Sequence, residues 1–113
     1  DTYGHPEGDR VLREMGRIIR REVRDVDVPA RYGGEEFIIM LPRTSPDEAY
    51  AIAERIRSMV QKRFAGHGDL TVSLGVAECP RHATTAAALI DAADKALYLS
   101  KHNGRNQTTL AQA

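Results

Sequence analysis

The sequence predicts an α+β domain with a mostly antiparallel central sheet flanked by helices. Apolar residues recur at helical spacing in three segments, and short β-type segments lie between them. A glycine pair, Gly33 and Gly34, separates two of those segments and suits the positive φ angles of a tight hairpin turn. The order helix, strand, hairpin, strand, helix, strand, helix, short strand is typical of helices packed on one sheet. A length of 113 residues suits one domain.

The first helix is expected over about residues 7–24, where apolar positions share one face and arginines and glutamates the other. Residues 26–32 then indicate a strand that leads into the glycines, with Pro29 at an edge or strand-end position. The uninterrupted apolar run 37–41 predicts a short, fully buried strand.

The second helix has a clear start signal. Ser45 is a capping residue, Pro46 suits the first helical position, and Glu48 completes a capping box. The helix is expected to end before Gly66. Its buried stripe is expected to be Ala49, Ile52, Ala53, Ile56, Val60 and Phe64.

Two more strands and a third helix are expected in the remaining sequence. Apolar and small or polar residues alternate over residues 70–77, which predicts a strand with one apolar face. A helix follows over about residues 85–102, with Gly104 as its stop signal, and residues 107–110 suit a final short strand.

Composition excludes several classes of protein. The formal net charge is zero, so no broad basic field indicates a nucleic-acid partner. The single cysteine, Cys79, rules out an intramolecular disulfide, and we expect a small buried or half-buried thiol. No apolar run approaches the roughly 20 residues of a membrane span, and neither a P-loop nor a Rossmann fingerprint is present. Because the first residue is Asp1, we expect a piece of a longer protein.

Five motifs occur in a fixed order along the chain. They are the segment 1–9, Arg24-x-x-Asp27, the Arg-Tyr-Gly-Gly-Glu-Glu-Phe of residues 31–37, the Val-Ser-Leu-Gly-Val-Ala of residues 72–77, and residues 94–106. In this combination the chain resembles the GGDEF family, the diguanylate cyclases, in its Glu-Glu form.

The resemblance implies a fold and a reaction. The fold would be a five-stranded sheet like the palm of nucleotide cyclases, with its first strand before Asp1. Residues 1–113 would then be a partial GGDEF domain, which we expect to be inactive alone. The reaction would join two GTP molecules into cyclic di-GMP with release of two pyrophosphates, in a homodimer with Mg²⁺ or Mn²⁺. We also expect an upstream sensory or receiver domain, and a cytoplasmic catalytic domain whether or not the whole protein is membrane-anchored.

The acids after the glycines have two interpretations. Glu35 and Glu36 could be the charged end of a hairpin, and neighbouring strand side chains point to opposite faces, so both are not expected to reach one metal equally. The resemblance makes Glu35 the metal ligand and Glu36 the supporting catalytic acid. Gly33 and Gly34 suit a turn, and their missing Cβ atoms would also let a nucleotide lie against the backbone.

Charged residues at two helix ends are candidates for substrate binding. Asp9 suits a helix start, and Lys101 and Arg105 suit a helix C-terminus, on dipole grounds alone. The resemblance places Asp9 on the guanine edge, where a carboxylate can accept from N1–H and the 2-amino group, which adenine cannot offer. It places Lys101 and Arg105 on the β- and γ-phosphates of GTP.

Arg24 and Asp27 are an ordinary surface pair when taken alone. The resemblance makes them an inhibitory product-binding site for cyclic di-GMP, with Arg55 as a second arginine. The main alternative function is a catalytically silent module that senses GTP or cyclic di-GMP. A pure dimerisation scaffold is a third possibility, and it would not need Arg-x-x-Asp at this spacing.

Overall fold

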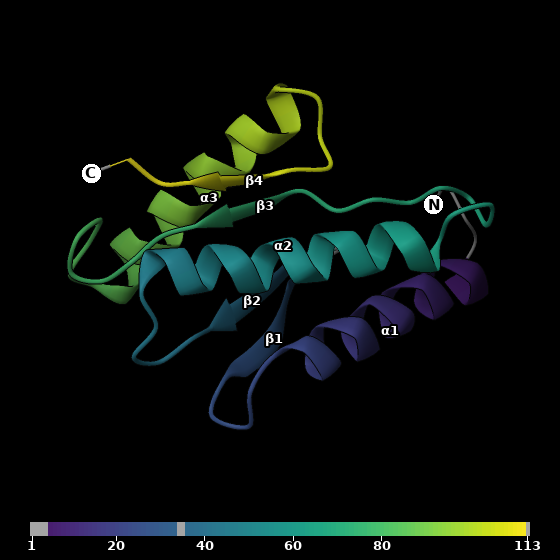
Figure 1. The fold of residues 1–113 in the computed structure, drawn as a ribbon, viewed down its shortest axis with the longest axis horizontal. Coiled ribbons are helices and arrows are strands. Elements are labelled where there is room, and N and C mark those ends of the chain that lie inside the picture. The colour runs from purple at the N-terminus through teal and green to yellow at the C-terminus, as the bar shows by residue number, and fades with distance from the viewer. Residues whose placement is uncertain (1–4, 34–35, 113) are drawn as a thin grey trace. The chain divides into compact units, whose positions relative to one another are not determined.

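The computed structural model describes residues 5–33 and 36–112. It contains helices and short sheets, which confirms the α+β class (Figure 1). The chain divides into two compact units, Asp1–Arg43 and Thr44–Ala113. In chain order the elements are α1 (His5–Glu22), β1 (Val28–Gly33), β2 (Glu36–Met40), α2 (Pro46–Arg63), β3 (Leu74–Val76), α3 (Ala86–His102) and β4 (Thr108–Leu110).

The first unit holds α1 and a hairpin. Strands β1 and β2 pair antiparallel, and Gly33 is the register partner of Glu36. A register shift lies between Arg31 and Gly33. Gly33 therefore belongs to the strand, whereas the sequence suggested Gly33 and Gly34 as the central turn pair. The two positions between the strands are Gly34 and Glu35, which lie outside the described residues.

Strand β2 is less buried than its composition predicted. Residues 37–39 are half-buried. Met40 and its register partner Val28 are 60% and 52% exposed. Val28 and Met40 form the last register pair of the β1–β2 hairpin, so a neighbouring pair covers them on one side only. The expectation that residues 37–41 form a fully buried strand is therefore wrong.

Helix α2 begins as its sequence predicted. The Glu48 backbone N–H donates to Ser45 Oγ at 3.1 Å, and the Ser45 N–H donates to Glu48 Oε1 at 3.0 Å. This reciprocal pair satisfies two amides that the helix start would otherwise leave unbonded. The expected stripe is buried in full, and its members are Ala49, Ile52, Ala53, Ile56, Val60 and Phe64.

Strands β3 and β4 pair in parallel, with Leu74 opposite Thr108 and Val76 opposite Leu110. The expected sheet was mostly antiparallel. The described strands instead form one antiparallel and one parallel pair. Helix α3 connects β3 to β4, and a helical crossover returns the chain in its original direction, which makes the two strands parallel. A strand was expected over residues 70–77. In the structure it is limited to Leu74–Val76, the residues that pair with β4.

Helix α3 packs closely against this parallel pair (Figure 1). A Cβ at Gly75 would collide with the backbone of Ala93 and Leu97, so only glycine allows this approach. Ser100 is fully buried, and its hydroxyl donates to Leu74 O at 2.8 Å. Ser100 Oγ also shares a 2.7 Å hydrogen bond with Thr109 Oγ1. The three elements are therefore joined by backbone contact and by one buried hydroxyl.

Cys79 is exposed, so the expectation of a buried or half-buried thiol is wrong. The residue lies in the loop between β3 and α3, and connecting loops run over protein surfaces. Among the described helices, none combines the length and apolar character needed to cross a membrane.

Candidate functional site

The hairpin end carries the predicted acids. Glu36 is the first residue of β2, is exposed, and stands opposite Gly33. Gly34 and Glu35, the expected metal ligand, lie outside the described residues. Within residues 5–33 and 36–112, no three His, Cys, Asp or Glu side chains form a group that could hold a metal.

The donor chemistry of the hairpin end nonetheless suits Mg²⁺. Magnesium prefers oxygen ligands and usually takes only one or two protein carboxylates, with water and phosphate completing its coordination. Glu36 presents an exposed carboxylate at the point where the strand begins. A hard divalent cation therefore fits the residues present, provided that a phosphate ligand shares it.

Asp9 is exposed and lies within α1, which begins at His5. The sequence had suggested a helix-start position for it. Because the helix-dipole effect falls off within the first turn, the dipole explains little of a carboxylate placed here. The structure leaves the Asp9 carboxylate available to solvent.

Arg24 and Asp27 are brought together by the turn that follows α1. The Arg24 guanidinium donates to both carboxylate oxygens, from Nη2 to Oδ1 at 2.6 Å and from Nε to Oδ2 at 3.0 Å. The Arg24 backbone N–H also donates to Oδ2 at 2.7 Å. The Asp27 side chain is fully buried, whereas that of Arg24 is 47% exposed. The Arg24 side-chain hydrogen bonds hold the pKa of Asp27 below the ordinary aspartate value.

This ion pair fixes the orientation of the guanidinium. Arg24 Nη2 also donates to the Pro42 carbonyl, at 3.1 Å, so the same side chain contacts the segment that follows β2. A planar cation held in this way, with about half of its surface exposed, is suited to a phosphate or to the acceptor edge of a base.

Arg55, the second arginine expected at the product site, is exposed on α2 in the second unit. Arg57 lies two residues further along α2. Arg57 is 21% exposed and forms a bidentate pair with Glu54, from Nε to Oε2 and from Nη2 to Oε1, both at 3.0 Å. This pair was not among the predicted site residues, although its i,i+3 spacing on a helix is a usable signal.

Lys101 and Arg105 lie on one segment, residues 101–107, which we call the cation turn. Lys101 is in the last turn of α3, and both side chains are exposed. The Arg105 backbone N–H donates to Ser100 O at 2.9 Å. Gln107 Nε2 donates to Asn103 O at 2.8 Å and to Arg105 O at 3.1 Å. The structure therefore places the two cations predicted for phosphate binding on one short, exposed segment.

Asn106 was not predicted as a site residue, yet it connects the cation turn to two other segments. Its side-chain oxygen accepts from Arg57 Nη1 at 3.1 Å. Its backbone N–H donates to Ser73 Oγ at 3.2 Å. No sequence signal pairs positions 57 and 106, because the two residues are 49 positions apart in the chain.

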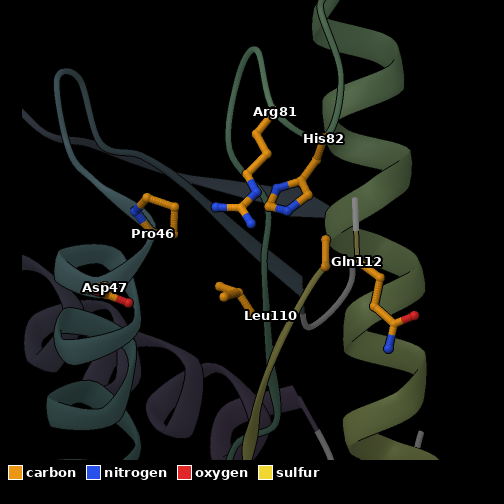
Figure 2. Close-up of a pocket in the computed structure, with 7 residues that line it drawn as sticks. Pro46, Asp47, Arg81, His82, Leu110 and Gln112 are labelled. Carbon is orange, nitrogen blue, oxygen red and sulfur yellow. The ribbon is translucent and has the colours of Figure 1, made fainter.

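A surface hollow of about 480 Å³ lies beside the start of α2. Figure 2 shows the Arg81 guanidinium and the His82 ring close together at its edge. His82 Nδ1 accepts from the Glu78 backbone N–H at 2.8 Å, so Nε2 carries the proton of the neutral ring. Among the described residues, none that was predicted to bind substrate, metal or product lines this hollow. The lining residues are Pro46, Asp47, Arg81, His82, Leu110, Ala111 and Gln112.

Comparison with known sequences gives consistent matches. Residues 1–107 match the family described as "Diguanylate cyclase, GGDEF domain". Diguanylate cyclase A of Treponema denticola is 47% identical over 116 residues, which cover 99% of this chain and 31% of that protein. The response regulator PleD of Caulobacter vibrioides is 42% identical over 112 residues, which cover 94% of this chain and 25% of that protein. The chain thus spans about a third or less of the length of these relatives.

Comparison with solved structures supports the fold. The GGDEF domain of DgcB from Caulobacter crescentus, solved in complex with c-di-GMP, matches with a TM-score of 0.87 and 36% identity over 100% of this chain and 70% of that chain. The active GGEEF domain of a diguanylate cyclase from Vibrio cholerae matches with a TM-score of 0.83 and 33% identity over 100% and 74% of the two chains.

Proposed function

The chain belongs to the GGDEF family of diguanylate cyclases, and from this premise we propose that its protein condenses two GTP molecules into cyclic di-GMP. The observation that carries the proposal is the family match over residues 1–107, which includes an intact Gly-Gly-Glu-Glu-Phe at residues 33–37. A module that had lost catalysis would not need to keep every one of these residues.

The cation turn is proposed to bind the triphosphate. Lys101 and Arg105 are exposed on one short segment, and Arg105 offers a planar fork of donors while Lys101 offers a point charge. Together they would neutralise the β- and γ-phosphates and stabilise the charge that develops on departing pyrophosphate. Asp9 would accept hydrogen bonds from the guanine edge, which distinguishes guanine from adenine.

Glu35 is proposed as the metal ligand, with Glu36 as the supporting acid. Bound Mg²⁺, or Mn²⁺ in its place, would act as a Lewis acid toward the attacking and phosphoryl oxygens. The contribution of the chain itself is to present carboxylate oxygens beside Gly33 and Gly34, where missing Cβ atoms leave room for the nucleotide.

The reaction is proposed to require two copies of the domain, each holding one GTP. The 3′-hydroxyl oxygen of one GTP forms a bond to the α-phosphorus of the other, and the bond from that phosphorus to the bridging oxygen of the β-phosphate breaks. Pyrophosphate leaves, and the hydroxyl proton passes to solvent. Because the same exchange occurs in the other direction, two pyrophosphates are released for each cyclic di-GMP.

A product-binding role is proposed for Arg24, Asp27 and Arg55. What supports it is the fixed, half-exposed guanidinium of Arg24, because a pre-oriented arginine loses little freedom when it binds a phosphate or guanine. A relative, the GGDEF domain of DgcB, has been solved with c-di-GMP. Control by an upstream sensory or receiver domain, and a cytoplasmic location with access to GTP, complete the proposal.

The test is to incubate the full-length protein with GTP and Mg²⁺ and to quantify cyclic di-GMP and pyrophosphate. We expect pyrophosphate and cyclic di-GMP in a ratio of two to one. Binding of GTP or cyclic di-GMP without turnover would favour the silent sensory module. Dimerisation without binding of either nucleotide would favour a scaffold, and both results would contradict the proposed activity.

A further inference from the structure

We propose that Arg57, held by Glu54, is a positioning residue that fixes the cation turn through the side chain of Asn106. The inference deepens the proposed function, on which it rests for the identity of the ligand. Arg57 would not touch the nucleotide. It would set the backbone position from which Arg105 reaches the phosphates.

The cation turn has a backbone that needs support. Arg105 and Asn106 both have positive φ, at 63° and 47°, and two consecutive non-glycine residues in this region are uncommon. Asparagine tolerates the left-handed conformation better than arginine does. Such a conformation persists only where surrounding contacts hold it. The contacts of Asn106 with Arg57 and Ser73 are of that kind.

Arg57 is well placed to supply a rigid anchor. Its bidentate pair with Glu54 leaves Nη1 directed at Asn106 Oδ1, 3.1 Å away, and Nη1 also donates to Gln61 at 3.3 Å. The Glu54 hydrogen bonds raise the pKa of Arg57, in agreement with a tightly held pair. Arg57 follows directly on the buried Ile56, so the backbone that carries it is fixed by the core.

The functional consequence concerns Arg105, the residue next to Asn106. If the Arg57–Asn106 bond is lost, residues 105 and 106 can leave their present φ values, and the Arg105 guanidinium then samples more positions. Affinity for a nucleotide that carries β- and γ-phosphates should fall, because the more mobile Arg105 loses more conformational entropy when it binds the phosphates. Affinity for GMP, which lacks both phosphates, should stay the same.

Four variants of the full-length protein separate this role from general destabilisation. Arg57→Met removes the donor and keeps an unbranched chain. Asn106→Gly removes the acceptor and keeps the positive φ accessible. Asn106→Asp retains both the acceptor and the backbone preference. Lys62→Met is the control, because it removes an exposed cation from the same helix.

The first readout is hydrogen exchange of the ligand-free protein, followed by mass spectrometry over the peptide that contains residues 105 and 106. We expect exchange at least about tenfold faster in Arg57→Met and Asn106→Gly, the effect of losing one charge-assisted hydrogen bond. Asn106→Asp and Lys62→Met should exchange like the parent protein. Unchanged exchange in the first two variants would overturn the proposal, whatever the nucleotide affinities.

The second readout is the affinity for GTP and for GMP by calorimetry. Arg57→Met and Asn106→Gly should each weaken GTP about tenfold and leave GMP unchanged, and their double variant should be no weaker than either single one. Equal losses for GTP and GMP would overturn the positioning role. If the parent protein does not bind GTP, the proposed function fails, while the exchange data still decide whether Arg57 fixes the turn.

Discussion

Asp27 Oδ1 lies 2.6 Å from Arg24 Nη2, in a pair whose carboxylate is fully buried and whose guanidinium is about half exposed. The same carboxylate accepts from the Arg24 backbone N–H, so it orders the chain between α1 and β1 as well as the side chain. Asp27 therefore orders the local backbone and also fixes the orientation of the Arg24 guanidinium.

The Asp27–Arg24 pair should make stability depend on pH. Hydrogen bonds from Arg24 lower the folded-state pKa of Asp27 below the ordinary value of 3.8. Its stabilising contribution is therefore fully present above that value and is lost as pH falls through the lower, folded-state pKa. Asp27→Asn should lower the free energy of unfolding by about 1–3 kcal/mol at pH 7, the cost of losing hydrogen bonds to a charged group.

The measurement is urea unfolding of both proteins from pH 7 down to pH 2. The difference between parent and Asp27→Asn should shrink at the acid end of this range. Asp25→Asn is the control, because Asp25 is exposed and lies in the same turn. A difference that stays constant over the whole range would show that the ionised carboxylate is not the stabilising species.

Replacing Glu35 by Gln in the full-length protein should lower GTP turnover by at least about 100-fold, the scale for losing one key electrostatic stabiliser. The side chain keeps its shape and loses the negative charge that a divalent cation requires. The comparison variant is Glu36→Gln, for which we expect a smaller loss. Thermal unfolding midpoints of all three proteins should agree, and full activity in Glu35→Gln would remove this residue from the mechanism.

Replacing Arg24 by Ala should weaken binding of cyclic di-GMP by at least about tenfold, since a charge-assisted hydrogen bond from the guanidinium to phosphate or guanine is lost. Calorimetry with cyclic di-GMP measures this directly. Arg20→Ala is the matched control, because it removes an exposed arginine from the last turn of α1. Equal affinities in the parent and in Arg24→Ala would mean that the Arg-x-x-Asp motif serves stability alone.

Replacing Ser100 by Ala should destabilise the second unit by about 1–3 kcal/mol, because Leu74 O and the Thr109 hydroxyl lose their shared buried partner. Ser58→Ala, at a half-buried serine of α2, is the control and should cost less. Guanidinium unfolding measures both. If Ser100→Ala leaves the free energy of unfolding unchanged, a water molecule must replace the hydroxyl.

The helices were predictable because their signals are local. The capping box of Ser45 and Glu48 and the buried stripe of α2 depend on residues within a few turns of each other, and both are confirmed. Hairpin register was less predictable, since the register shifts between Arg31 and Gly33 and Gly33 pairs with Glu36 as part of β1. A register shift of this kind leaves no mark in the alternation of apolar residues.

The contacts that hold the candidate site in place were the least predictable from the sequence. Lys101 and Arg105 could be found from their motif, but the contact of Asn106 with Arg57 joins positions 49 apart. The parallel pairing of β3 with β4 depends on where α3 returns the chain. Such contacts follow from packing in three dimensions, which a single sequence does not record.

Substitutions of Gly75 would affect the candidate site through the packing of α3. Any side chain there would push α3 away from β3, and α3 leads directly into the segment that carries Lys101 and Arg105. In a saturation library selected for nucleotide turnover, position 75 would therefore rank with the positions proposed to contact substrate, because a side chain there displaces α3. Selecting the same library for folded protein would separate the two kinds of loss.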